Sequence, residues 1–203
     1  MRINTIRLRV WLGCLAILLP WIVVLLNDFS FPESISATYY IPACITPFMG
    51  ILVASSVILM CYKGYDRVDD IVLSLSGFFG LLICLFPTYS YTDEFVGTFQ
   101  TPVEISSMIH NLAAIAFFGL LSYNSLFLFT KGDGTPTANK KKRNIIYRIC
   151  GVGMIASFAI LLLPAFDIQI WLLEMFALTF FGLSFLTKAD VFPFLFCDTP
   201  YTD

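Results

Sequence analysis

Long apolar runs separated by short polar segments form the main pattern along this chain. Each run is about twenty residues long, and a helix of that length, rising about 1.5 Å per residue, crosses a hydrocarbon layer of roughly 30 Å. The pattern therefore predicts an all-α fold, a six-helix transmembrane bundle that forms one domain over residues 1–203. The expected helices cover about 10–26, 41–62, 69–86, 102–129, 145–163 and 168–187.

Capping residues indicate where several of these helices begin. The stretch from Thr101 to Glu104 has the form of a helix start, with a threonine cap, a proline in the first turn and a glutamate three residues after the cap. Asp69 or Asp70 is expected to cap the third helix, and Asp167 the sixth. Residues 131–144 are interpreted as a loop because they contain glycine, proline and a basic run.

The charged residues separate into two sides of the predicted bundle. All 12 Lys and Arg residues fall on the side that holds both chain ends, and the other side carries only acidic charge. Cytoplasmic loops are enriched in Lys and Arg, so we expect the basic side and both termini to face the cytoplasm. The expected location is the plasma (inner) membrane. The run Lys140–Arg143 can also attract anionic lipid headgroups.

Composition supports a membrane protein and excludes several other classes. Hydrophobic residues make up 58% of the chain and charged residues 13%, against about a quarter charged in soluble proteins. The sequence has no glycine-rich phosphate loop, zinc-protease motif, nucleophile elbow or nucleic-acid signature. We therefore predict no catalytic residues, no cofactor and no nucleic-acid partner. Membrane lipids are the expected partners, and a homo-oligomer is left open.

His110 and Glu174 are polar ionisable residues deep inside predicted spans on the acidic side. His110, the only histidine, and Glu174 are each about two turns from the predicted outer ends of their helices. Ionisable groups in a membrane are costly unless they pair or face a polar interior. We therefore expect His110 and Glu174 to pair in a ligand-binding cavity whose rim is formed by Ser36, Tyr39 and Tyr40. The competing interpretation is that these groups only hold helices together.

Several short motifs are spread between Ser34 and Lys188. They are Ser34–Tyr40, Gly50, Tyr62–Asp66, Leu85–Thr88, Ile109-His110 and Tyr147-Arg148. Together they resemble a group of uncharacterised bacterial six-helix membrane proteins, the domain-of-unknown-function family numbered nine hundred and ninety-eight. The resemblance implies the topology and no settled activity. Members often carry a histidine and an Arg-Asp pair where this chain has Ile41, Ile45 and Thr46.

Three functions remain as hypotheses. The first is a membrane protein with a ligand-binding or sensing cavity open to the outer side and no catalysis. The second is a small oligomeric transporter or channel, which requires a polar path between the His110 layer and a deeper layer around Asn124. The third is a lipid-modifying intramembrane hydrolase, similar to alkaline ceramidases and adiponectin-receptor-like proteins. Those enzymes hold zinc with three histidines, and this chain has one, so we predict no metal site.

Overall fold

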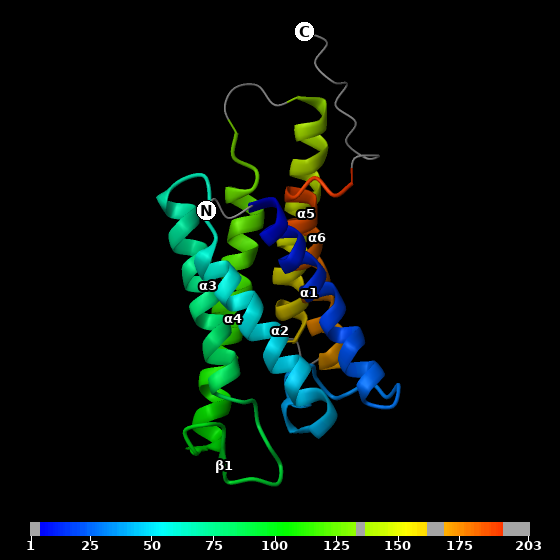
Figure 1. The fold of residues 1–203 in the computed structure, drawn as a ribbon, viewed down its shortest axis with the longest axis vertical. Helices are drawn as coiled ribbons and strands as arrows, with labels where there is room; N and C mark the ends of the chain where they lie inside the picture. Colours follow the sequence, from blue (N-terminus) through cyan, green and yellow to red (C-terminus); the bar gives the residue numbers. More distant parts are fainter. Residues whose placement is uncertain (1–4, 133–136, 162–168, 193–203) are drawn as a thin grey trace.

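Six long α-helices make up most of the computed structural model (Figure 1). They are α1 (Thr5–Leu26), α2 (Pro42–Cys61), α3 (Arg67–Leu85), α4 (Val103–Tyr123), α5 (Ala138–Leu161) and α6 (Ile170–Lys188). The structure describes residues 5–132, 137–161 and 169–192. Within these ranges all six helices are long and apolar enough to cross a membrane, so the predicted all-α fold is confirmed.

Large apolar side chains cover the outward faces of the helices. Trp11, Trp21, Leu112 and Val152 are each more than half exposed, at 60%, 53%, 61% and 58%. Continuous apolar faces of this kind are rare on proteins surrounded by water. In a bilayer they contact lipid chains at no cost, and the chain is therefore a multi-pass membrane protein.

Shorter elements connect the helices. The connection from α1 to α2 contains the 3-10 helix η1 (Ser36–Tyr40). The connection from α3 to α4 contains two short antiparallel strands, β1 (Phe95–Val96) and β2 (Thr101–Pro102). At its other end, α4 continues into a π-helical turn, η2 (Asn124–Leu128).

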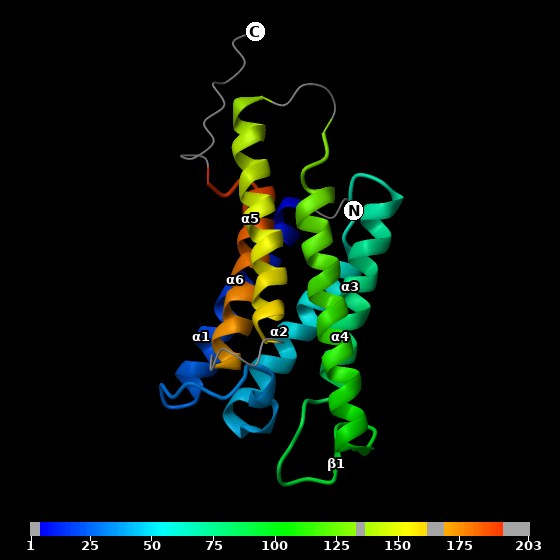
Figure 2. The ribbon, with the colours of Figure 1, turned by 180° about the vertical axis from the view of Figure 1, so that it is seen from behind.

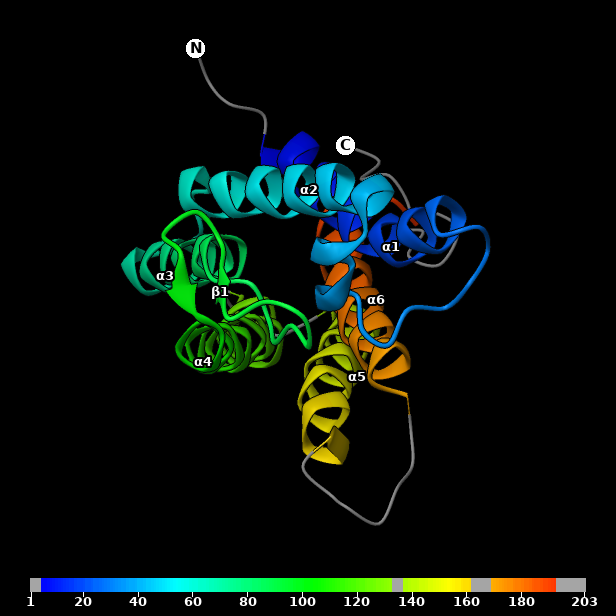
Figure 3. The ribbon, with the colours of Figure 1, turned by 90° about the horizontal axis from the view of Figure 1, so that it is seen from below.

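The helices are arranged as a closed ring. Each packs against the next in sequence, and α6 packs back against α1, as the end-on view in Figure 3 shows. Gly13 and Gly182 face one another where α1 crosses α6. A Cβ built on Gly182 would lie 2.7 Å from the Gly13 carbonyl oxygen, so the two backbones meet with no room for a side chain. Small residues permit such close helix contacts in membranes.

Buried aromatic rings pack between α4, α5 and α6, three helices whose backbones are seen from behind in Figure 2. The ring centroids of Phe117 and Phe181 are 6.2 Å apart, and those of Phe181 and Phe185 are 5.0 Å apart. Phe129 continues the series, 5.0 Å from Phe185 and 5.5 Å from Tyr147. These buried rings form one continuous apolar cluster inside the bundle.

The two ends of the bundle differ in charge. The start of α1, the α2–α3 connection, the start of α5 and the end of α6 lie together at the upper end in Figure 1. We call this the basic end, since it carries Arg9, Lys63, Lys131, Lys140 and Lys188. The opposite, acidic end contains η1 and the β1–β2 segment, with Asp93, Glu94 and Glu104. The predicted separation of charge is thus present among the described residues.

Helix α5 begins earlier than predicted, so the basic run is helical. The expected loop over residues 131–144 is wrong from position 138 onward, where α5 starts. Thr137 explains the early start, because its hydroxyl accepts the Lys140 amide at 3.2 Å and its carbonyl accepts the Lys141 amide at 3.0 Å. A threonine cap of this kind supplies partners for amides that the first turn leaves free.

Two other predicted helix starts also need correction. Asp66, and not Asp69 or Asp70, caps α3 by accepting the amides of Val68 and Asp69. Helix α4 begins at Val103 without a side-chain cap, because the expected cap, Thr101, is paired in β2 instead. The predicted Asp167 cap and the predicted helix ends at 163 and 168 lie outside the described residues.

Candidate functional site

The predicted pair at the acidic end does not form. His110 donates from Nδ1 to the Phe86 carbonyl at 2.9 Å, whereas Glu174 accepts the Ile35 amide and also contacts Ser36. The prediction that His110 and Glu174 pair is therefore wrong, since each is held by the backbone of a different element. Because α6 begins at Ile170, Glu174 lies one turn from the helix end, level with η1.

His110 belongs to a set of three side chains that hold the segment after α3. The helix ends at Leu85, and the carbonyls of residues 86–88 need donors from elsewhere. His110 donates to the first, Ser106 Oγ to the second at 2.8 Å and the Tyr40 hydroxyl to the third at 2.6 Å. A carbonyl without a partner in an apolar layer costs several kcal/mol, so these three contacts stabilise the turn.

Glu174 holds the start of η1 through hydrogen bonds. Its carboxylate accepts the amide at the start of this short helix, and the hydroxyl of Ser36 adds a second contact. The expected closeness of Glu174 and Ser36 is thus present. Tyr39 packs edge-on against Tyr40 with ring centroids 5.1 Å apart. Burial, with Tyr39 and Asp93 nearby, raises the pKa of Tyr40 to about 12. These residues contact backbone groups, the Ser36 hydroxyl and a neighbouring ring.

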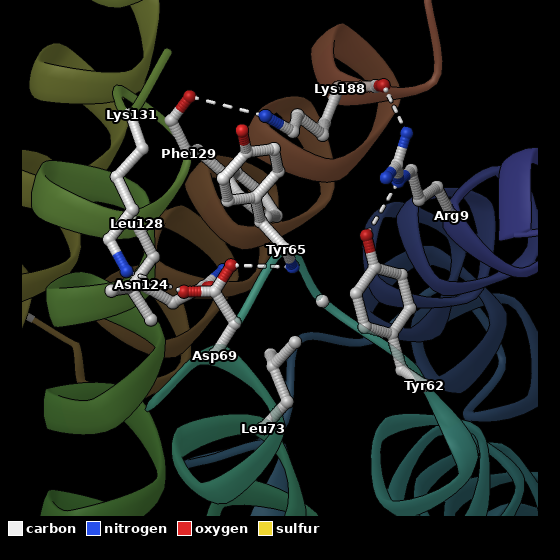
Figure 4. Close-up of a pocket in the computed structure, with 11 residues that line it drawn as sticks. Arg9, Tyr62, Tyr65, Asp69, Leu73, Asn124, Leu128, Phe129, Lys131 and Lys188 are labelled. Carbon is white, nitrogen blue, oxygen red and sulfur yellow. Dashed lines mark hydrogen bonds and ion pairs between the residues drawn. The ribbon is translucent and has the colours of Figure 1, made fainter. Parts of the chain in front are cut away.

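A cavity of about 170 Å³ lies at the basic end, among α1, α3, η2, α6 and the α2–α3 connection (Figure 4). Its polar and charged lining residues are Arg9, Tyr62, Tyr65, Asp69, Asn124, Lys131 and Lys188. The described part of the chain thus brings three cations and one carboxylate around one internal space. The sequence indicated none of this, because Arg9 and Lys188 served there only to predict the orientation.

Asn124 is the least accessible polar residue of this cavity. It opens the π-helical turn η2, in which the Phe129 amide bonds the Asn124 carbonyl at 2.8 Å. The side chain is 1% exposed, and its amide nitrogen and oxygen have no protein partner. A buried polar group without a partner costs about 1–3 kcal/mol, and π-turns are frequent at functional sites. The amide is therefore available to a molecule in the cavity.

One wall of the cavity is a network of ion pairs. Lys131 Nζ lies 2.8 Å from Asp66 and 2.9 Å from Asp69, and the Tyr65 amide donates to Asp69 at 2.9 Å. The hydrogen bond from Lys131 lowers the pKa of Asp66, and the two carboxylates raise the pKa of Lys131. The network joins the α2–α3 connection to the segment after η2, and each carboxylate oxygen of Asp69 accepts one hydrogen bond.

In the opposite wall, two cations donate hydrogen bonds to neutral groups. Arg9 Nε donates to the Tyr62 hydroxyl at 2.7 Å, and Arg9 Nη1 donates to the Lys188 carbonyl at 3.0 Å. Lys188 Nζ donates to the Phe129 carbonyl at 3.3 Å and lies 5.2 Å from the centre of that ring. Burial raises the pKa of Tyr62. Neither cation has a carboxylate at ion-pair distance among the described residues.

A second cavity of about 360 Å³ adjoins the first. Its lining residues are Arg9, Lys140, Arg143, Tyr147, Lys188 and Asp190. Arg9 and Lys188 line both cavities. Together the two cavities form a polar region where α1 and α5 begin and α6 ends.

Metal ligands and relatives give no further guidance. Within residues 5–132, 137–161 and 169–192, no three His, Cys, Asp or Glu side chains come together as a metal site would require. Comparison with protein-family models, with curated proteins and with solved structures finds no match to this chain.

Proposed function

We propose that this protein is a ligand-binding or sensing membrane protein whose site is the cavity at the basic end. The observation that carries the proposal is Asn124, a buried amide with both polar atoms unpartnered at the wall of that cavity. A bound polar molecule would remove the cost of the unpartnered amide. The cavity expected around His110 has less support, because that side chain already serves the backbone.

Binding is favoured over catalysis by the state of Asp69. A general base needs a carboxylate that is free to accept a proton from the substrate. Asp69 instead accepts hydrogen bonds from Lys131 and from the Tyr65 amide. We therefore assign Asp69 to the wall of the site.

Orientation and family are part of the same proposal. The concentration of Lys and Arg at the basic end supports a cytoplasmic position for that end in the plasma membrane. The cavity would then open toward the cytoplasm, with lipids as neighbours. Membership of the six-helix family that the motifs resemble is supported by the six helices and by nothing more specific.

Cysteine accessibility tests the proposal without knowledge of the ligand. In a background without native cysteines, Asn124→Cys places a thiol on the cavity wall. Ser184→Cys is the matched control, because Ser184 is also 1% exposed but lines neither cavity. A small neutral methanethiosulfonate reagent should modify position 124 roughly tenfold faster than position 184, since a fully enclosed thiol reacts only after local opening.

A bulky side chain placed in the cavity should block the access of the reagent to position 124. Leu73 lines the same space, and Leu73→Trp added to Asn124→Cys should slow the modification. Equal rates at positions 124 and 184, or a rate at position 124 that Leu73→Trp leaves unchanged, would overturn the proposed site.

A further inference from the structure

We infer that the ligand presents a phosphate group, held by Arg9, Lys140 and Lys188 in the second cavity at the basic end. The inference rests on the proposed function and adds the chemical class of the ligand. Arg9 and Lys188 line both cavities. A phosphate bound between them would leave the rest of the ligand within reach of the first cavity and Asn124.

Three helices bring the cations together. Arg9 comes from the start of α1 and Lys188 from the end of α6, while α5 contributes one face of its first turns. On that face Lys140, Arg143 and Tyr147 follow one another at spacings of three and four residues, which keeps them on one side of a helix. The remaining two lysines of the basic run are exposed. Half of the run therefore faces the cavity.

The cavity carries an excess of positive charge. Four basic side chains and one carboxylate, Asp190, line it, and Asp190 is already paired with Arg143. Arg9, Lys140 and Lys188 are held by backbone carbonyls or a phenol. Among the described residues none of these three has a carboxylate at ion-pair distance. Like charges held close together are unfavourable, so an anion would stabilise the arrangement.

A phosphate monoester matches this arrangement better than a carboxylate does. It carries a charge of about −1.5 to −2 and three acceptor oxygens, whereas a carboxylate carries one charge and two oxygens. Guanidinium groups bind phosphate through paired hydrogen bonds, and lysine contributes a point charge. Three cations from three helices thus match the charge and the three acceptor oxygens of a phosphate monoester.

The position of the site suits a lipid as well as a soluble phosphate. The cations lie at the ends of α1, α5 and α6, where helices leave the apolar layer and lipid phosphates are found. Basic pockets between transmembrane helices recognise phosphorylated headgroups in this layer. A free phosphate compound would enter the same site from water, and the experiment distinguishes the two sources.

The test is a titration of the thermal unfolding midpoint of the purified full chain in a neutral detergent. The probes are inorganic phosphate, dioctanoyl phosphatidic acid and dioctanoyl phosphatidylcholine, at ionic strength held constant with sodium chloride. Phosphatidic acid should raise the midpoint, since a ligand that binds only the folded state stabilises it. Phosphatidylcholine should not, because its phosphate is a singly charged diester.

Variants locate the effect. Arg9→Gln and Lys188→Gln should each require roughly tenfold more phosphatidic acid for the same shift, as expected for loss of one charge-assisted contact. Lys140→Gln is a further variant near the start of α5, and it should weaken the response to phosphatidic acid in the same direction. Arg148→Gln is the matched control, since it removes an equal charge from an exposed position on the same helix.

The outcomes separate the alternatives. If inorganic phosphate acts as phosphatidic acid does, the phosphate group alone is sufficient. If only phosphatidic acid acts, the ligand is a lipid. The inference is overturned if neither acts, or if Arg148→Gln weakens binding as much as Lys188→Gln. In that case rapid modification of the Asn124→Cys variant would still support a binding cavity for a ligand of another class.

Discussion

At the acidic end, individual polar side chains each form a hydrogen bond with a backbone group that has no partner within a helix or strand. Tyr40 is the clearest example, because it joins η1 to the segment after α3 through a single bond of 2.6 Å to the Thr88 carbonyl. Its hydroxyl must stay protonated to donate. Burial, with Tyr39 and Asp93 nearby, raises the pKa of Tyr40 to about 12, above its ordinary value of 10.0.

The stabilisation by Tyr40 should therefore depend on pH. The folded protein holds this proton more tightly than the unfolded chain, so the contribution is fully present below pH 10 and is lost as the pH rises toward 12. Tyr40→Phe should lower the free energy of unfolding at pH 7 by about 0.5–1.5 kcal/mol, the net value of one hydrogen bond. Equilibrium unfolding in mixed detergent micelles measures the change.

The variant should also respond less to high pH. Between pH 9 and 11 the wild-type protein should lose more stability than Tyr40→Phe does. Tyr39→Phe is the control, because no hydrogen bond of the Tyr39 hydroxyl is found in the described part of the chain. Parallel pH profiles for the wild type and Tyr40→Phe would contradict the assignment.

Among the elements, the contact between α1 and α6 depends on two glycines. Gly182 in α6 would place a Cβ 2.7 Å from the Gly13 carbonyl oxygen and 2.6 Å from Ile17 Cγ1. The carbonyl belongs to the backbone and cannot move aside as a flexible side chain can. The close approach therefore fixes the distance between the first helix and the last.

Adding one methyl group at this crossing should separate the helices. Gly182→Ala should lower the free energy of unfolding by roughly 1–3 kcal/mol, the usual cost of overpacking. Gly119→Ala is the matched control, since a Cβ at Gly119 meets nothing within 4 Å. That change should be neutral or stabilise the helix by up to about 1 kcal/mol. Equal effects of the two substitutions would refute the close-packed crossing.

The elements also show what the sequence can predict. Hydrophobic runs locate all six helices, because a span needs a nearly uninterrupted apolar segment. The rotation of each helix about its axis leaves no such signal, which is why the depth match between His110 and Glu174 did not become a contact. The Asn124 site was missed for the same reason. In the sequence its amide has the same pattern as an interhelical packing residue, and only the structure places it at a cavity.

For the whole molecule, the unequal charge of the two ends is the main guide to orientation. The α2–α3 connection and the start of α5 share the basic end, and the β1–β2 segment lies at the acidic end. Moving basic loops across a membrane is unfavourable, and this is the basis of the cytoplasmic position proposed for the basic end. The proposed opening of the cavity toward the cytoplasm depends on this orientation.

Cysteine labelling of cells tests the orientation. Lys141 and Asp93 are both exposed and lie at opposite ends. In a background without native cysteines, a membrane-impermeant maleimide should label Asp93→Cys in intact cells. Lys141→Cys should react only after permeabilisation. The reverse pattern would invert the topology and place the cavity outside the cell.

Closure of the ring has a consequence for how the protein is made. Arg9 of α1 bonds the carbonyl of Lys188 in α6, and both residues line the two cavities. Of the six helices, α1 is synthesised first and α6 last. Helix α1 therefore has no α6 to pack against until all the other helices have been made. The site is consequently absent until α6 has been made. A ligand bound there would contact only chains that already contain α6, and it would hold α1 and α6 together.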